Sequence, residues 1–439
     1  MATEERSKLW VALAASSVGT VLEWYDFALY GAASALVFNK IFFPQFDPIA
    51  GTMAAFAAYA VGFVIRPFGG ILFGSLGDRY GRKPVLLATL VLMGISTTLI
   101  GLLPTYDQVG IWAPAGLVLL RAIQGLGAGA EYGGAILVAA ESAPNRRGFY
   151  ASFPAAAVDV SLVIATALFA LFKLMPPDDF LAWGWRIPFL LGSVVFLLSL
   201  YVRRRMTETD DFVRSARAPT TQKASGAPLR RVLRDHRREL LLAAGANVAP
   251  SLSYVFQIFS LSYAVTQLKL PASTILIGVL LSGVAGAIGS LTFGALSDRF
   301  GRPRLILIGG LFTALFAFPF FALLGTGIPA VIWFAVVVAH LGERIAFGAQ
   351  PAFYAELFPV ELRYTGIALA REVTGAVIAG PLPLLATALV ASSGGAPWLV
   401  AGLACLMGLV TAVTGAVAGQ ARKRPTFSSE ARAAAAPNS

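Results

Sequence analysis

Long apolar segments separated by short polar ones run along the whole chain. The apolar runs are long enough for α-helices to cross the hydrocarbon core of a bilayer. They are continuous rather than alternating, which excludes a transmembrane β-barrel. The pattern predicts twelve membrane-spanning helices, at residues 9–38, 52–76, 84–104, 111–140, 148–175, 184–202, 239–267, 273–297, 303–324, 329–358, 363–391 and 393–418. The predicted fold class is therefore an all-α, multi-pass membrane protein.

Composition supports this interpretation. The 439 residues are 57% hydrophobic and only 13% charged, whereas soluble domains carry roughly a quarter charged residues. The first apolar run is too long for the core of a signal peptide, so we expect it to be retained as the first helix. A single cysteine, Cys405, leaves no partner for an intramolecular disulfide.

The distribution of basic residues predicts the orientation. Of the 34 Lys and Arg residues, 26 fall on the side of the predicted bundle that carries both termini, four on the opposite side and four inside spans. The positive-inside rule therefore places both termini and the loop 203–238 in the cytoplasm. The net charge of +11 is thus explained by the orientation of the chain in the membrane and by contact with anionic lipid. No nucleic-acid partner is expected.

Two motifs are repeated at the same place in successive groups of six spans. GSLGDRYGRKP (74–84) recurs as GALSDRFGRPR (294–304), and ESAPNRRG (141–148) is echoed by ELFPVELRYTG (356–366). The repeat predicts two homologous halves in parallel. The predicted units are an N-terminal half (1–202), a basic cytoplasmic linker (203–238), a C-terminal half (239–420) and a disordered cytoplasmic tail (421–439). The end of the linker can form a basic amphipathic helix at the membrane surface.

These motifs resemble those of the major facilitator superfamily. The G-x-L-x-D-R-x-G-R-K pattern is complete in residues 74–83 and nearly complete in 294–302, and RAIQGLGAGAEYGGA (121–135) is similar to the R-x-x-Q-G motif of the fourth span. The metabolite:proton symporters are the subfamily that the chain resembles, through EWYDFALYG (23–31), FVIRPFGG (63–70), WGWRIPF (183–189) and AELFPVELRYTG (355–366). The resemblance implies proton-coupled uptake of a small organic acid or compatible solute by alternating access, across a bacterial inner membrane.

Charged residues at the cytoplasmic ends of the spans are candidates for a gate. The resemblance implies an inter-helix charge lattice that closes this side when the carrier faces outward, and charge pairs that break and re-form suit such a latch. The alternative is that these charges only set the topology. The candidate gate residues are Asp78, Arg79, Arg82, Glu141, Arg147, Asp298, Arg299, Arg302, Glu356 and Arg363.

Three charged residues of the first half are predicted at similar depth. At 1.5 Å per residue, Asp26 lies about 18 Å from the outer end of its span, Arg121 about 15 Å from the outer end of its own, and Asp159 about 17 Å from the inner end of its own. They could meet near the middle of the bilayer, where an unpaired charge is costly. Glu23 shares a helix face with Asp26, and Tyr30 lies one turn further along.

This arrangement suggests a physical basis for proton coupling. Burial favours the protonated form of a carboxyl group, whereas a nearby arginine favours the ionised form. An anionic substrate that bound the arginine would therefore release the acid to take a proton. The alternative is a permanent structural salt bridge. Either Glu23 or Asp26 can carry the proton, and depth favours Asp26.

The second half departs from the pattern of the family. Span 10 carries His340, Glu343 and Arg344 where the first half has small residues, and span 11 carries Arg371 and Glu372. One interpretation is that Glu343–Arg371 and Arg344–Glu372 are structural cross-helix pairs. The other makes Arg371 or Arg344 an anchor for a substrate carboxylate, and His340 or Glu343 an auxiliary proton site.

Span 7 carries a polar stripe that either lines a cavity or packs against neighbouring helices. Its members are Asn247, Ser251, Tyr254 and Gln257. The candidate substrate-binding residues are Arg121, Arg371, Tyr30, Tyr25, Tyr254, Gln257, Asn247 and Arg344. The candidate proton-coupling residues are Asp26, Glu23, Asp159, Glu343 and His340.

No catalytic set is recognisable, and no enzyme activity or cofactor is expected. With one Cys and two His there are too few soft ligands for a zinc site, and no phosphate-binding P-loop is present. The expected partners are a small organic anion, protons and the lipid bilayer, with the chain as a monomer. A zwitterion importer remains open. A drug:proton antiporter is disfavoured because span 5 lacks the G-x-x-x-G-P motif of the exporters, and a membrane sensor because no signalling domain is recognisable.

Overall fold

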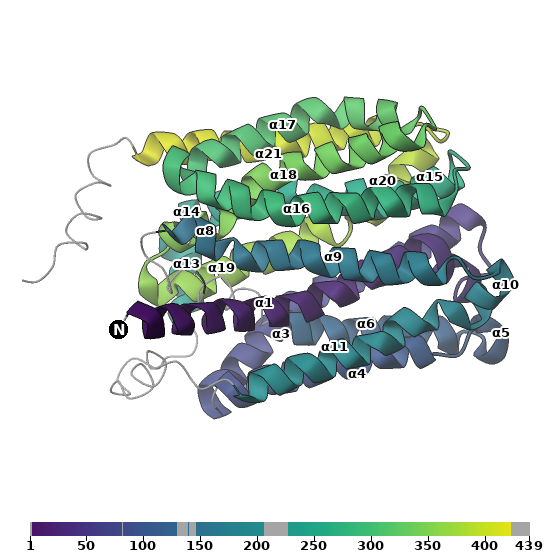
Figure 1. The fold of residues 1–439 in the computed structure, drawn as a ribbon, viewed down its shortest axis with the longest axis horizontal. Helices are drawn as coiled ribbons and strands as arrows, with labels where there is room; N and C mark the ends of the chain where they lie inside the picture. Colours follow the sequence, from purple (N-terminus) through teal and green to yellow (C-terminus); the bar gives the residue numbers. More distant parts are fainter. Residues whose placement is uncertain (1, 81, 130–138, 140–145, 206–226, 423–439) are drawn as a thin grey trace, which may run out of the picture.

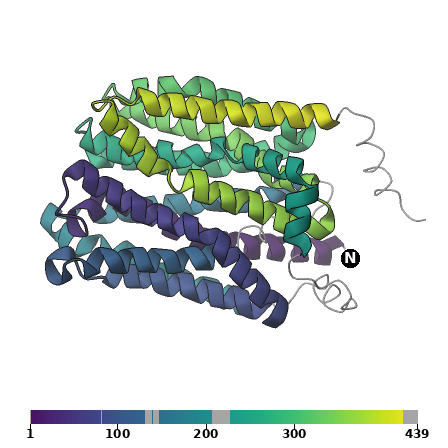
Figure 2. The same cartoon turned by 180° about the vertical axis from the view of Figure 1, so that it is seen from behind.

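The computed structural model describes residues 2–80, 82–129, 139, 146–205 and 227–422. Every regular element in these ranges is a helix. Most helices run side by side along the long axis of the molecule. The first half, purple to blue, forms one layer, and the second half, green to yellow, forms the other (Figure 1, and from behind in Figure 2). The predicted all-α class with two halves is confirmed.

The first half contains six long helical stretches, some of them preceded by a short helix. They are α1 (Ala2–Ala33), which continues through the π-turn Ser34–Phe38 into α2 (Asn39–Ile41); α3 (Pro48–Tyr80); α4 (Arg82–Leu102); α5 (Tyr106–Val109) and α6 (Trp112–Ala128); α8 (Arg147–Ala151) and α9 (Phe153–Phe172); and α10 (Pro177–Asp179), the π-turn Phe180–Gly184 and α11 (Arg186–Arg205). Each coincides with a predicted span of this half over the described residues.

The second half repeats this order, with two of its stretches broken. They are α14 (Arg237–Ala246), the 3-10 turn η5 (Ala249–Leu252), the π-turn η6 (Tyr254–Phe259) and α15 (Ser260–Thr266); α16 (Ala272–Phe300); α17 (Arg302–Leu324); α18 (Pro329–Leu357); α19 (Val360–Thr374), the π-turn η7 (Gly375–Ala379) and α20 (Leu382–Ser392); and α21 (Trp398–Arg422). Before them, α13 (Ala227–Asp235) forms the basic helix expected at the end of the linker.

The surface of the bundle suits a membrane. Within the described residues, eight helical segments are long and apolar enough to cross a bilayer, and the bent pair Pro177–Gly184 with Arg186–Tyr201 makes a ninth. Outward-facing leucines are exposed, as Leu315 is at 77%. Trp112, Trp183 and Trp398 are exposed too, and all three stand at the end of the bundle opposite the termini, where tryptophan typically marks the interface with lipid headgroups.

The two halves meet along a boundary formed by a few helices. On one side α9 packs between α1 and α16, and on the other α3 packs against η7 and α20. Figure 1 shows α9 and α16 lying next to each other across this boundary. We call the end at which α1 begins and α21 ends the terminus side of the bundle.

Glycines allow α3 and α6 to pack backbone to backbone. A Cβ on Gly125 would lie 2.2 Å from the carbonyl oxygen of Gly62, and one on Gly129 would lie 2.1 Å from that of Arg66. Small residues permit this close approach between membrane helices. The contact fixes the facing positions of Arg66 on α3 and Arg121 on α6.

We expect Gly125→Ala to destabilise the protein, because the added methyl group overlaps a backbone carbonyl that cannot move without its helix. Overpacking of this kind costs about 1–3 kcal/mol, so the midpoint of thermal unfolding in detergent should fall. The matched control is Gly402→Ala on α21, where a Cβ meets no atom within 4 Å. An equal midpoint for the two variants would contradict the importance of this contact.

Candidate substrate and proton site

A cavity lies at the boundary between the halves, about midway along the bundle. It contains about 440 Å³ of empty space, part of it continuous with the outside. Elements of both halves line it: Trp24 of α1, Phe63 and Arg66 of α3, Val158 of α9, Asn247 to Tyr254 around η5, Arg344 and Phe347 of α18, and Arg371, Gly375 and Ala379 around α19 and η7. The two halves thus share the walls of one space at their boundary.

Broken helices supply one wall of the cavity. Pro250 interrupts the regular hydrogen bonding between α14 and η6, and Pro381 follows the π-turn η7. Irregular backbone at membrane depth is tolerated where it lines a cavity, because polar groups can be satisfied there. The breaks bring Asn247, Ser251 and Tyr254 of the span 7 stripe to the cavity wall, whereas its fourth member, Gln257, contacts His340.

Three arginines line this cavity. Arg66 forms an ion pair with Glu23, and its guanidinium carbon lies 4.2 Å from the ring centre of Phe27. The guanidinium carbon of Arg371 lies 5.5 Å from the ring centre of Trp24. The side chain of Arg344 is 3% exposed, so protein groups rather than bulk water surround its guanidinium. Arg66 and Arg371 thus each lie against an aromatic ring.

Asp26 and Arg121 are paired, as their predicted depths suggested. An Asp26 carboxylate oxygen accepts a hydrogen bond from Arg121 Nη1 at 3.2 Å, and the other accepts one from the Thr97 hydroxyl at 2.8 Å. The Arg121 side chain is fully buried under the rings of Phe27, Tyr30 and Tyr59, with its guanidinium carbon 4.0–5.0 Å from their centres. These rings separate Arg121 from the residues that line the cavity.

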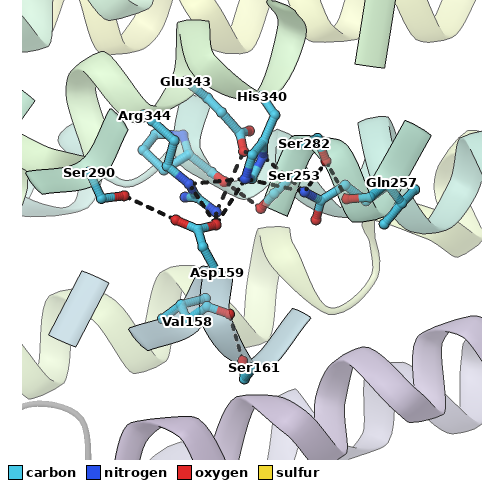
Figure 3. Close-up of polar contacts among 12 residues, drawn as sticks. Val158, Asp159, Ser161, Ser253, Gln257, Ser282, Ser290, His340, Glu343 and Arg344 are labelled. Carbon is cyan, nitrogen blue, oxygen red and sulfur yellow. Dashed lines mark hydrogen bonds and ion pairs between the residues drawn. The ribbon is translucent and has the colours of Figure 1, made fainter. Parts of the chain in front are cut away.

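Asp159 does not join this pair; the prediction that it meets Asp26 and Arg121 was wrong. It lies on the face of α9 that packs on α16, where Arg344 Nη2 donates to its Oδ1 at 2.9 Å and the Ser290 hydroxyl to its Oδ2 at 3.0 Å (Figure 3). Depth along a helix can be counted from sequence, but the direction in which a side chain points depends on how the helix is packed.

His340 completes a cluster around Asp159. Its Nε2 lies 2.9 Å from Asp159 Oδ1, and its Nδ1 lies 2.7 Å from Glu343 Oε1. The structural pairs expected from sequence are replaced by this cluster, because Arg344 contacts Asp159 rather than Glu372 and Glu343 contacts His340 rather than Arg371. Gln257 reaches the same imidazole at 2.9 Å.

The predicted tyrosines are divided between cavity and core. Tyr254 lines the cavity, whereas Tyr30 lies in the core with its ring centre 4.4 Å from the guanidinium carbon of Arg121. Tyr25 points toward α11, where its hydroxyl donates to the carbonyl of Pro188 at 2.6 Å. Asn247 accepts a hydrogen bond from Gln350 at 3.0 Å at the cavity edge.

The described gate residues link the two halves at the terminus side. The backbone amides of Gly148 and Phe149 donate to the Asp298 carboxylate at 2.8 and 3.1 Å. Arg302 bridges Asp298 and Glu356, at 2.8 and 2.9 Å. The described parts place Arg147 at the start of α8, the exposed Arg299 near the end of α16, and Arg363 on α19. The side chains of Asp78, Arg79 and Arg82, and all of Glu141, lie outside the described residues.

Several residues of the site were not picked out from sequence. Arg66 carried the clearest signal, because an arginine inside a predicted span is by itself a functional indication. Ser290, Phe63 and Phe347 gave none, since serine and phenylalanine are common in membrane helices. Their roles follow only from what they face in the folded protein.

Comparison with known proteins places this architecture. A family model described as the Major Facilitator Superfamily matches residues 12–381, and a second match covers residues 244–437. The chain is 40% identical over 408 residues to the shikimate transporter of Escherichia coli K12, which covers 91% of this chain and 92% of the relative. It is 34% identical over 422 residues to the proline/betaine transporter of the same organism, which covers 93% and 83%.

The fold is shared with a more distant solved structure. The crystal structure of a D-xylose-proton symporter superimposes with a TM-score of 0.71 at 19% identity, and the match covers 92% of this chain and 97% of that one. The named relatives are all transporters, and none is an enzyme.

We expect Asp298→Ala to loosen the terminus side, because it removes the acceptor of the two α8 amides. Hydrogen bonds to a charged group contribute about 1.5–3 kcal/mol each, so the closed arrangement should lose at least about tenfold in population. The measurement is the rate of N-ethylmaleimide labelling at Ala155→Cys, a buried boundary position, with Cys405 replaced by alanine.

The matched control is Asp235→Ala on α13, an acidic side chain that is 56% exposed and pairs with its neighbour Arg234 at 4.0 Å. Its labelling rate should equal that of the parent. Equal rates in the Asp298 and Asp235 variants would show that the Asp298 contact does not hold the halves together.

Proposed function

Because the chain belongs to the Major Facilitator Superfamily, we propose that it takes up a small organic anion together with protons across the bacterial inner membrane. The substrate is a carboxylate, and transport proceeds by alternating access of the central cavity to the two sides. Both termini and the gate around Asp298 face the cytoplasm. The chain acts as a monomer in the lipid bilayer.

The observation that carries this proposal is the set of three arginines in one cavity. Arg66, Arg344 and Arg371 surround a space that is also lined by aromatic and apolar side chains and by the polar stretch around Asn247 and Ser251. Guanidinium groups bind carboxylates through paired hydrogen bonds, and the rings of Trp24, Phe63 and Phe347 suit an apolar or cyclic body. The 40% identical relative named as a shikimate transporter supports a cyclic carboxylate.

The balance of buried charges supports proton coupling. Among the described residues, four buried arginines stand against five buried carboxylates. With His340 neutral and every carboxylate ionised, the interior therefore carries one net negative charge. An incoming anion adds a second. Since uncompensated charge is costly in a membrane interior, a proton is expected to enter with the substrate.

Asp26 is the proton site that we favour in the first half. Its partner Arg121 is enclosed by aromatic rings and faces no cavity space, so in this proposal Arg121 serves as the counter-ion of Asp26 instead of contacting substrate. Glu23, paired with the cavity residue Arg66, is the second acid of this half. Arg371 and Arg344 are the anion anchors already expected from sequence, and Arg66 is added to them.

A compatible-solute importer is the second candidate function. The proline/betaine transporter that is 34% identical favours it. The cavity could accommodate a zwitterion with its carboxylate on an arginine and its ammonium against the ring of Trp24 or Tyr254. Three cavity arginines disfavour a cationic group, however, and this is why the anion is preferred.

Uptake by proteoliposomes tests the function. With an acidic exterior, we expect shikimate or benzoate to accumulate against its gradient, and the accumulation to collapse with a protonophore. Arg371→Gln should weaken apparent affinity about tenfold or more, because a charge-assisted contact is lost. Arg237→Gln, an exposed arginine at the start of α14, is the control. Accumulation of proline or glycine betaine alone would establish the second candidate, and indifference to the protonophore would refute proton coupling.

We expect Asp26→Asn to abolish uphill uptake while leaving exchange of labelled for unlabelled substrate measurable, because the amide keeps the hydrogen-bonding shape but cannot carry the proton. Asp47→Asn, an exposed carboxylate that caps the amides of Ile49 and Ala50 at 3.0 Å, is the control and should transport normally. Unchanged accumulation in the Asp26 variant would assign the proton to another group.

A further inference from the structure

Asp159 is a side chain of one half enclosed by the other. It projects from α9, and each of its described hydrogen-bond partners, Arg344, His340 and Ser290, belongs to the second half. Glycines of α16 leave room for it: a Cβ on Gly286 would lie 2.9 Å from the Asp159 carboxyl carbon. Asp159 is therefore a carboxylate plug inserted across the boundary.

His340 stands between this plug and a second carboxylate. One ring nitrogen faces Asp159 and the other faces Glu343, at 2.9 and 2.7 Å. A neutral imidazole has one N–H and can donate to only one of them, whereas the imidazolium donates to both. The two carboxylates therefore favour the protonated form of the ring, because only the imidazolium can donate to both.

Within the described parts of the chain, one cation contacts the ring. Arg344 Nε lies 3.2 Å from His340 Nε2, on the same helix. From the other helices packed around His340, α9 contributes Asp159, while η6 and α16 contribute the uncharged side chains of Gln257 and Ser282. The described charges in contact with the ring are thus two carboxylates and one guanidinium.

Arg344 belongs both to this cluster and to the cavity. Its Nη2 and Nε donate to Asp159 Oδ1 at 2.9 and 3.1 Å, and the residue also lines the central cavity. An anion that binds Arg344 from the cavity neutralises the cation that contacts His340. The loss of that cation favours the addition of a proton to the imidazole.

We infer that His340 is a substrate-linked proton site: an anion bound at Arg344 in the cavity and a proton bound at His340 stabilise each other, with Asp159 as the shared partner. This inference rests on the proposed function for the nature of the anion. By reciprocity, the two ligands raise each other's affinity by the same factor.

The coupling between anion and proton also affects the contact that Asp159 makes between the halves. When the anion draws Arg344 toward the cavity, the imidazolium still holds Asp159, so the plug keeps a cationic partner as the substrate binds. When anion and proton are both absent, Arg344 returns to Asp159. The site thus exchanges the partner of one inter-half carboxylate according to whether substrate and proton are present.

A single-histidine protein makes the proton directly observable. The chain has two histidines, and His236 is a half-buried residue at the start of α14, 3.8 Å from Glu239. In the His236→Gln background, labelling histidine with 15N gives ring resonances from His340 alone. At fixed pH, we expect saturating shikimate to move them toward the imidazolium positions, and His236→Gln to leave uptake unchanged. Bound shikimate with unmoved resonances would overturn the inference.

A second arm needs no ligand. Arg344→Gln removes the same charge that the anion neutralises, so the ligand-free variant should show a severalfold larger protonated fraction of His340 at fixed pH. Arg344→Lys keeps the charge and should leave that fraction close to the parent value. Equal resonances in the Gln and Lys variants would overturn the inference whatever the substrate is.

The two arms separate this inference from the proposed function. If neither shikimate nor benzoate binds or is taken up, the proposed substrate class fails, while the Arg344 variants still decide whether the cation and the proton are linked. If shikimate is accumulated but His340 does not respond in either arm, the function stands and the proton is carried elsewhere, as at Asp26.

Discussion

Buried charges that need partners organise this molecule. Ten Asp, Glu, His and Arg side chains are buried among the described residues, in a bundle whose outer faces suit lipid and offer no water to solvate them. Such groups persist only where opposite charges and hydrogen-bond donors are held close. The helix packing supplies both: glycines let α3 approach α6 beside Arg66 and Arg121, and let α16 approach α9 beside Asp159. The interior is a set of paired charges around one cavity.

The pairs differ in what they can exchange. Asp26 and Arg121 lie in one half, behind aromatic rings, so their pairing is insulated from the cavity. Asp159 and Arg344 lie in different halves, and Arg344 also faces the cavity, so an anion can compete for it. One bundle thus holds an enclosed acid suited to carry a proton and an accessible arginine suited to sense substrate, connected through the boundary at which the halves must move.

The two ends of the boundary are closed by different means. At the terminus side, Asp298 accepts hydrogen bonds from the backbone amides of α8 and forms an ion pair with Arg302. This closure is polar and can be broken by competing water. On the far side of the cavity, a Cβ on Gly31 would lie 2.4 Å from the Ile258 side chain, so the closure is apolar packing. Rocking one half against the other exchanges a hydrogen-bonded contact for a packed one.

The sequence by itself determined the class, the helices and the repeat. Hydrophobic run length is a local property, so the helical stretches of the described residues could be located, and the repeated loop motifs indicated the two halves. It also identified most charges of the site, because any ionisable residue in a lipid-length run stands out. Only the tertiary structure decided which charges meet. The depth of a residue can be counted along its helix, whereas the direction of its side chain depends on how that helix packs. This is why Asp26 pairs with Arg121 as expected, while Asp159 contacts Arg344 and His340 of the other half.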